Sequence, residues 1–202
     1  LLDALPIYAE TASAMTLLGR ALVTDGKYAD AADMLQQALN TEERVYGSVH
    51  PRVASTLNEL GKVAQKQGKL DLAKADFERM ADIYRKVYNG KHYYIGIALS
   101  NLAGVYVDEK QYEQAEKLLR EALQLYSETL PAGHLNVGIA RIRLGRVLLL
   151  QHNYSQAQTE TQAGYDIVQK QNDPPSSWIQ NARKDLIEEY SGLKEPQKVL
   201  EL

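Results

Sequence analysis

Histidines are the side chains in this chain best suited to bind a metal ion or transfer protons near neutral pH. Three of them, His50, His92 and His134, recur every 42 residues, and the fourth is His152. Equivalent positions of stacked helical repeats lie about 10 Å apart, whereas a metal ion needs its ligands at about 2 Å. The three histidines therefore cannot share one ion. We expect each to hydrogen-bond a neighbouring turn and hold that loop in place.

Acidic pairs and known motifs give no better case for catalysis. Glu42-Glu43 and Glu188-Glu189 have charged or polar neighbours, so we expect them on solvated helix faces. The chain has no cysteine, which excludes disulfides, thiolate metal sites and thiol nucleophiles. It also lacks a phosphate-binding loop, a Gly-x-Ser-x-Gly elbow and a His-Glu-x-x-His helix. We predict no enzyme activity, no metal site and no cofactor.

The composition is that of a globular protein. Hydrophobic residues make up 45% and charged residues 24% of the 202 positions, close to the average for folded domains. The net charge of −3 and the pI near 5.9 argue against a nucleic-acid partner, since such proteins are usually basic. The purest apolar run covers only 147–150, far below the roughly 18–20 residues of a membrane span. The sequence does not fix the compartment, and the cytoplasm is favoured. The start at Leu1, without Met, favours a segment of a longer protein.

The sequence repeats itself every 42 residues. From Leu18-Gly19, this step leads to Leu60-Gly61, Leu102-Ala103, Leu144-Gly145 and Leu186-Ile187. A second column of small residues contains Ala31, Ala73, Ala115, Ala157 and Val199. Several independent columns at one spacing indicate a repeat architecture.

Each repeat has the pattern of two helices. In the second repeat, Val53, Leu57, Leu60 and Val63 follow one another at steps of three and four, as on one face of a helix. The expected first helices cover 9–25, 51–67, 93–109, 135–151 and 177–192. The expected second helices cover 28–46, 70–88, 112–130 and 154–172, followed by a shorter one at 196–202. Since no strand pattern is present, the predicted fold is all-α.

These columns resemble the tetratricopeptide repeat (TPR), which has Leu-Gly or Leu-Ala in its first helix and Ala early in its second. A unit of 42 residues instead of about 34, with His50-Pro51 before a first helix, resembles the kinesin light chain type of this repeat. His92 and His134 keep the histidine but lack the proline. The resemblance implies a right-handed superhelical solenoid of antiparallel helix pairs, with the first helices lining its concave side.

The repeat register also predicts the domain organisation. Residues 1–8 are a lead-in or the end of a preceding unit, and 177–202 form a partial unit or capping helix. The four complete repeats cover 9–50, 51–92, 93–134 and 135–176. The later repeats depart from the pattern, with Arg141 and Arg183 in a column of Met and Leu, and Thr161 in the column of Phe77. We interpret these departures as capping of the solenoid by a more polar end.

Polar residues of the first helices are candidates for binding a peptide. Asn58 and Asn101 can each donate to and accept from a peptide backbone, and arginines bind carboxylates through two parallel hydrogen bonds. The predicted groove consists of Arg20, Asn58, Lys62, Asn101, Arg143, Arg146 and Lys184. It would take a peptide with acidic residues or a free C-terminus, unless these charges are only solvated helix surface. Thr16 and Arg20 stand where chaperone-binding TPR domains have the Lys and Asn of a two-carboxylate clamp, which disfavours chaperone tails.

The leading functional prediction is therefore a non-enzymatic protein–protein interaction scaffold that belongs to a larger protein. The resemblance also implies arrays joined to a signalling enzyme, so a regulatory module of such an enzyme is one alternative. The other is a self-assembling spacer that forms homo-oligomers through 196–202 or the apolar segment 1–5. The sequence leaves the oligomeric state open.

Overall fold

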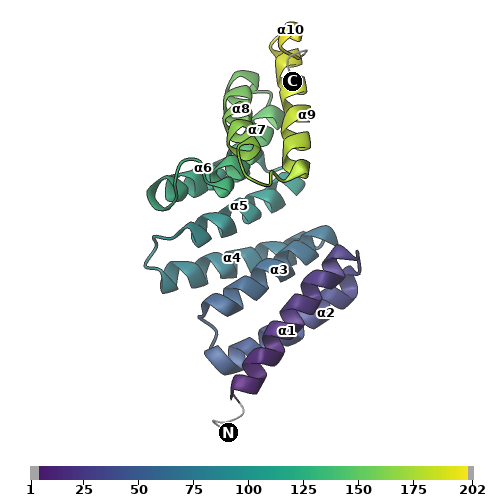
Figure 1. Ribbon diagram of the computed structural model, residues 1–202, viewed down its shortest axis with the longest axis vertical. Helices are drawn as coiled ribbons and strands as arrows, with labels where there is room; N and C mark the ends of the chain where they lie inside the picture. The colour runs from purple at the N-terminus through teal and green to yellow at the C-terminus, as the bar shows by residue number, and fades with distance from the viewer. Residues whose placement is uncertain (1–4, 200–202) are drawn as a thin grey trace. The chain divides into compact units, whose positions relative to one another are not determined.

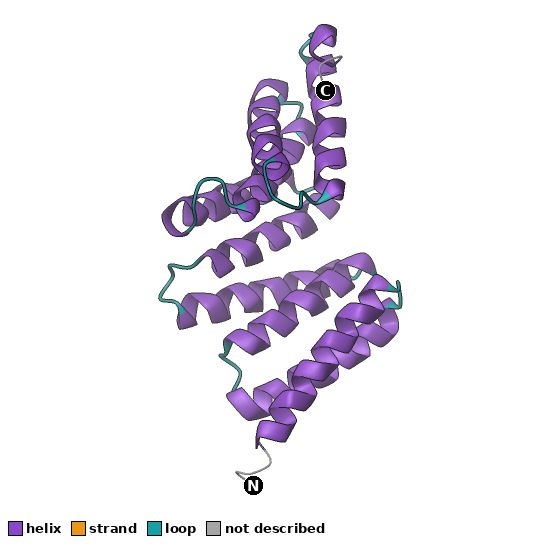
Figure 2. Cartoon of the chain, in the orientation of Figure 1, coloured by secondary structure: helices purple, strands orange, loops and turns teal. Residues whose placement is uncertain are grey.

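The computed structural model describes residues 5–199, which form ten helices joined by short turns (Figure 1). Within this range there is no strand, so the all-α prediction is confirmed (Figure 2). The helices are α1 (Leu5–Thr24), α2 (Tyr28–Tyr46), α3 (Pro51–Lys66), α4 (Leu70–Val87), α5 (Tyr93–Asp108), α6 (Tyr112–Thr129), α7 (Leu135–Leu150), α8 (Tyr154–Gln169), α9 (Ser176–Gly192) and α10 (Pro196–Val199).

Helix boundaries follow the repeat register. The largest difference from the predicted ranges is at α1, which begins at Leu5 and not at residue 9. Helix α10 begins at Pro196 as expected, and its predicted continuation to 202 lies outside the described residues. Most of the 1–5 segment named for self-assembly also lies outside them.

One left-handed residue closes the first helix of every repeat. Its φ is 75° at Gly26, 72° at Gly68, 60° at Lys110, 61° at His152 and 60° at Lys194. Glycine adopts this conformation without strain, and it commonly ends helices. The later repeats keep the same turn although a side chain is present, so the turn geometry belongs to the repeat and not to glycine alone.

The repeated histidines act at the start of the next first helix. The Nδ1 atoms of His50, His92 and His134 accept hydrogen bonds from backbone N–H groups two residues later, at 3.2, 3.2 and 3.1 Å. These bonds satisfy N–H groups that have no partner inside the helix. The expectation that these three histidines hydrogen-bond a neighbouring turn is confirmed.

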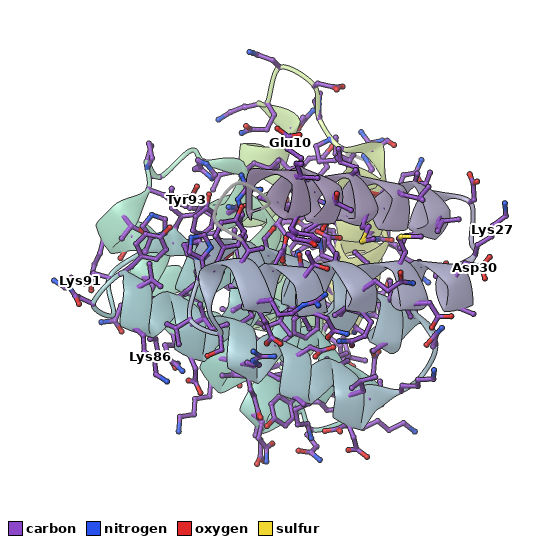
Figure 3. All side chains as sticks on the ribbon, turned by 90° about the horizontal axis from the view of Figure 1, so that it is seen from below. Glu10, Lys27, Asp30, Lys86, Lys91 and Tyr93 are labelled. Atoms are coloured by element: carbon purple, nitrogen blue, oxygen red, sulfur yellow. The ribbon has the colours of Figure 1, made fainter. Side chains whose placement is uncertain are left out.

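The chain forms two compact units, the N-terminal unit Leu1–Val105 and the C-terminal unit Tyr106–Leu202. In the N-terminal unit, α1 packs on α2, α2 on α3 and α3 on α4. Glycine permits this close packing, since a Cβ at Gly61 would lie 2.7 Å from the Phe77 ring. Figure 3 shows Lys27 and Asp30, at the α1–α2 turn, on the opposite edge of this unit from Lys86 and Lys91, beside the α4–α5 turn.

In the C-terminal unit, α6 packs on α7, α7 on α8 and α8 on α9. Its last helices share an apolar core of Ile142, Tyr165, Val168, Ala182, Leu186 and Tyr190. None of the helices in the described range combines the length and apolarity needed to cross a lipid bilayer.

Candidate peptide-binding surface

In the N-terminal unit, the predicted residues meet around Glu59, between α1, α3 and α5. Arg20 Nη2 lies 3.3 Å and Lys62 Nζ 3.5 Å from Glu59 Oε1. Asn58 Nδ2 donates to the same oxygen at 3.1 Å, and Asn101 Nδ2 donates to Asn58 Oδ1 at 2.8 Å. We call these five residues the polar row. The structure thus brings together all four candidates that sequence reasoning placed in this unit.

Glu59 offsets part of the positive charge that the sequence predicted. Its side chain is only 13% exposed, whereas those of Arg20 and Lys62 are about half exposed. Half-exposed ion pairs of this kind add little stability, about 0–1 kcal/mol. Their main effect is on charge, since two cations and one carboxylate leave the polar row with one net positive charge.

The C-terminal unit repeats this pairing at Arg146. Its Nη1 lies 2.9 Å from Asp185 Oδ1 and 3.5 Å from Glu188 Oε2, both on α9. Burial raises the pKa of the Asp185 carboxyl, and the Arg146 and Lys184 charges act in the opposite direction. Arg146 is therefore held by two carboxylates of its own chain.

Arg143 has a different environment. It is half-buried, and its guanidinium carbon lies 5.3 Å from the centroid of the Trp178 ring, a cation–π geometry. Burial lowers the pKa of this guanidinium, which the Tyr126 hydroxyl opposes. Of the three candidates in this unit, Arg146 and Lys184 both act on Asp185, while Arg143 packs against Trp178.

The spacing of the charged residues in the sequence indicates these ion pairs, although the number of charges does not. Arg146 and Asp185 are 39 positions apart, and the same spacing separates Arg20 from Glu59. A spacing of 39 residues is three residues shorter than the repeat. The partner residue therefore lies in the next first helix, about one helical turn before the position equivalent to the arginine. Opposite charges at this spacing predict an ion pair between neighbouring repeats.

A hollow of about 320 Å³ lies near the N-terminal ends of α1 and α3. It is lined by Ala9, Glu10, Ser13, Ala14, Leu17, Tyr46 and Arg52. Arg52 Nη1 donates to the Ser13 hydroxyl at 2.8 Å, and the guanidinium lies over the Tyr46 ring, 5.6 Å from its centroid. Ser13 and Arg52 are again 39 positions apart. The hollow therefore lies along the same α1–α3 seam as the polar row. Sequence reasoning missed this hollow, including Tyr46 and Arg52 in its lining.

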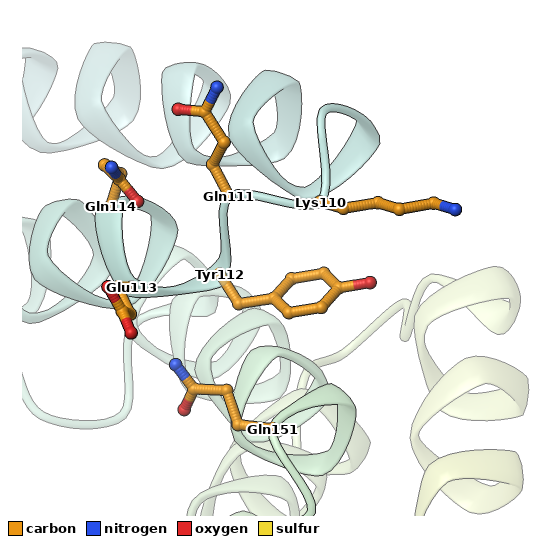
Figure 4. A pocket seen from close by; sticks show the side chains of 6 residues that line it. All are labelled: Lys110, Gln111, Tyr112, Glu113, Gln114 and Gln151. Carbon is orange, nitrogen blue, oxygen red and sulfur yellow. The ribbon is translucent and has the colours of Figure 1, made fainter.

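A second hollow, of about 600 Å³, lies in the C-terminal unit beside the α5–α6 turn (Figure 4). Its walls are polar and contain none of the predicted groove residues. They consist of Lys110, Gln111, Tyr112, Glu113, Gln114 and Gln151. The Lys110 side chain extends away from Gln151 in Figure 4. Across the described part of the chain, no three His, Cys, Asp or Glu side chains are placed to hold a metal ion.

The prediction that both acidic pairs lie on solvated faces is wrong for one member of each. Glu42 is 3% and Glu189 0% exposed, whereas Glu43 forms an ion pair with Arg79 and Glu188 is exposed. The repeat register gives the reason, because Glu42 shares a column with the buried Tyr84 and Tyr126. Burial raises the pKa of Glu42, while a Thr56 hydrogen bond and the Arg52 charge lower it.

The repeat pattern is that of a known protein family. A family model described as the tetratricopeptide repeat matches three overlapping stretches, 10–86, 52–128 and 94–170. The chain belongs to the tetratricopeptide repeat family. No match was found among curated proteins.

Solved structures support the same assignment. BtubC (BKLC) from P. vanneervenii superposes with a TM-score of 0.83 at 17% identity, over 97% of this chain and 78% of that one. The nearly identical TPR-like repeats of a Podosopora anserina kinesin light chain-type protein superpose with a TM-score of 0.75 at 19% sequence identity. This match covers 96% of this chain and 92% of that one. A Rap protein complexed with competence and sporulation factor gives 0.76 at 18% identity, over 93% of this chain and 50% of that one. The resemblance to kinesin light chain-type repeats is confirmed, and at these identities it is a likeness of fold.

Proposed function

We propose that this TPR chain is a non-enzymatic scaffold that binds a peptide segment of a partner protein along its first helices, as part of a larger protein. The observation that carries this proposal is the polar row, in which amides from successive first helices are one hydrogen bond apart. An extended peptide rises about 3.3 Å per residue. Because the Asn58 and Asn101 amides are only 2.8 Å apart, they can both bind the backbone of the same peptide residue or of two adjacent ones.

The neighbouring hollow favours a peptide with an apolar residue beside an acidic one. Leu17 offers a largely exposed apolar surface, and Arg52 offers a guanidinium bound to a hydroxyl and an aromatic ring. The net positive charge of the polar row also favours an acidic residue in the peptide. Because Glu59 and Asp185 already bind Arg20 and Arg146, we expect the preference for acidic peptides to be modest.

The comparisons support a protein partner. Tetratricopeptide repeats are protein-interaction repeats, and the Rap protein of the same fold was solved in complex with competence and sporulation factor. This chain covers half of that Rap protein.

A display selection tests this proposal. A random peptide library is selected on the whole chain, and enriched peptides are measured against Asn58→Ala/Asn101→Ala. The matched control is Gln36→Ala/Asn40→Ala, because these exposed amides of α2 also bond to each other, at 3.0 Å. We expect the Asn58/Asn101 variant to lose at least about tenfold in affinity, the worth of one hydrogen bond to a peptide. Equal affinity for both variants and wild type would reject the polar row as the binding site.

Self-association is a second candidate, favoured by one observation. Leu18 on α1 is 49% exposed, whereas Leu60 in the same column is 8% exposed, and Ile7 and Tyr8 of α1 are also exposed. Light scattering at micromolar concentration checks this candidate. A monomer excludes it, and a dimer that dissociates in Leu18→Lys supports it.

A further inference from the structure

Two residues of the C-terminal unit break the apolar pattern of the repeat. Glu189 on α9 stands in a column that is apolar in the preceding first helices, namely Val63, Val105 and Val147. Thr161 on α8 stands in a column of large buried side chains in the preceding second helices, namely Leu35, Phe77 and Leu119. A carboxyl and a hydroxyl have thus replaced apolar side chains at two core positions of the repeat.

These two residues are partners. Thr161 Oγ1 donates to Glu189 Oε1 at 2.6 Å, and neither residue is exposed. Thr161 lies against Gly145, where a Cβ would approach its hydroxyl to 2.0 Å. The other carboxyl oxygen, Glu189 Oε2, is buried without a hydrogen-bond partner among the described residues. A buried ionised carboxylate with one unsatisfied oxygen is strongly unfavourable.

The surrounding charges do not compensate for ionisation. On its own helix, Glu189 is near the carboxylates of Asp185 and Glu188, which repel a further negative charge. Helix α8 presents only the Thr161 hydroxyl, and α7 presents the Arg146 cation. Arg146 is already paired with Asp185 and Glu188. Consistent with this arrangement, burial raises the pKa of Glu189 to about 7, and only Thr161 and Arg146 lower it.

We propose that the packing of α9 on α7 and α8 is proton-linked through Glu189: the helix packs closed when this carboxyl is neutral and loosens when it ionises. The pKa of Glu189 is about 7 when packed and 4.5 in the unpacked chain. The stabilising effect of the proton is therefore complete below about pH 4.5 and is lost as the pH rises through about 7. Because α9 also carries Asp185 and Glu188, its loosening releases Arg146. The proposal does not depend on peptide binding, since the chain alone tests it.

Hydrogen exchange of the α9 amides in the whole chain, corrected for intrinsic rates, measures this opening. For wild type, we expect the opening constant to increase by up to about tenfold per pH unit between about pH 5 and 7, because one proton is released on opening. Above about pH 7 the opening constant should level off. Glu189→Gln keeps the shape and an acceptor for Thr161 but cannot ionise, so its opening constant should not vary in this way. Amides of α3 and α4, in the other unit, serve as the internal reference.

A second variant and a direct titration keep the proposal falsifiable. Thr161→Leu/Glu189→Val restores residues that other repeats have in these columns, and the first repeat already packs a leucine, Leu35, against the equivalent glycine, Gly19. We expect the α9 opening of this variant to lack the increase that Glu189 gives the wild type between about pH 5 and 7. In the wild-type chain, NMR of the Glu189 carboxyl carbon should show a midpoint near 7. A midpoint near 4.5, or the same α9 pH profile in wild type and Glu189→Gln, would overturn the proposal.

Discussion

The absence of a Cβ atom at a glycine decides how closely the two helices of a repeat can pack. A Cβ at Gly61 would lie 2.7–2.9 Å from three atoms of the fully buried Phe77 ring. We therefore expect Gly61→Ala to lower the free energy of unfolding by about 1–3 kcal/mol, the usual cost of overpacking. Chemical denaturation of the whole chain measures this change.

The matched control is Gly104→Ala in α5. Here the nearest atom to a new Cβ is Gln65 Nε2 at 3.4 Å, an ordinary contact with a flexible side chain. Alanine should then stabilise the helix by up to about 1 kcal/mol through its higher helix propensity. A loss of equal size in both variants would show that packing against Phe77 is not the cause.

A histidine gives the N-terminal unit its own pH dependence. His92 Nδ1 accepts the Tyr94 N–H and cannot do so once protonated. Burial lowers the pKa of His92 below its usual 6.5. The stability it contributes is present above pH 6.5 and lost as the pH falls through the lowered pKa. We expect His92→Asn, whose amide oxygen can accept the same bond, to reduce the acid sensitivity of α5 in hydrogen exchange. An unchanged pH profile would contradict this role.

The hydrogen bonds of the histidines were easier to predict from the sequence than the burial of Glu189. The histidine bonds could be predicted, because each histidine precedes the helix that it binds. The burial of Glu189 was predicted incorrectly, since its immediate neighbours are polar. The column shared with Val147, and not the local composition, determines that this position faces the core.

Among the helices, the packing of α9 depends on its apolar face. Leu186 is fully buried in the core shared with Ile142 and Tyr165, while Ile187 is 44% exposed. We expect Leu186→Ala to lower the free energy of unfolding by about 2–5 kcal/mol, and Ile187→Ala to change it by less than about 0.5 kcal/mol. Denaturation curves of the two variants decide this, and similar losses would contradict the described packing.

Element positions were the part most accessible to prediction. A fixed period places every helix once two are located. The start of α1 was missed because no histidine or glycine precedes Leu5. The hollow beside α1 was missed because Tyr46 and Arg52 come from two other elements.

For the whole molecule, net charge was a poor guide to the proposed binding surface. The chain has a net charge of −3, and sequence reasoning saw a line of cations on the first helices. The structure pairs Arg20 with Glu59 and Arg146 with Asp185. Specificity is therefore expected from amide hydrogen bonds and the apolar hollow more than from charge.

The central claim, that a peptide binds along the polar row, is tested most directly by mapping backbone amide shifts. An enriched peptide is titrated into the isotope-labelled chain, and the perturbed residues are compared with the structure. We predict the largest shifts at Asn58, Lys62 and Asn101 and at the hollow beside Leu17. Shifts confined to the second helices α2 and α4, or to the hollow around Tyr112, would contradict the claim.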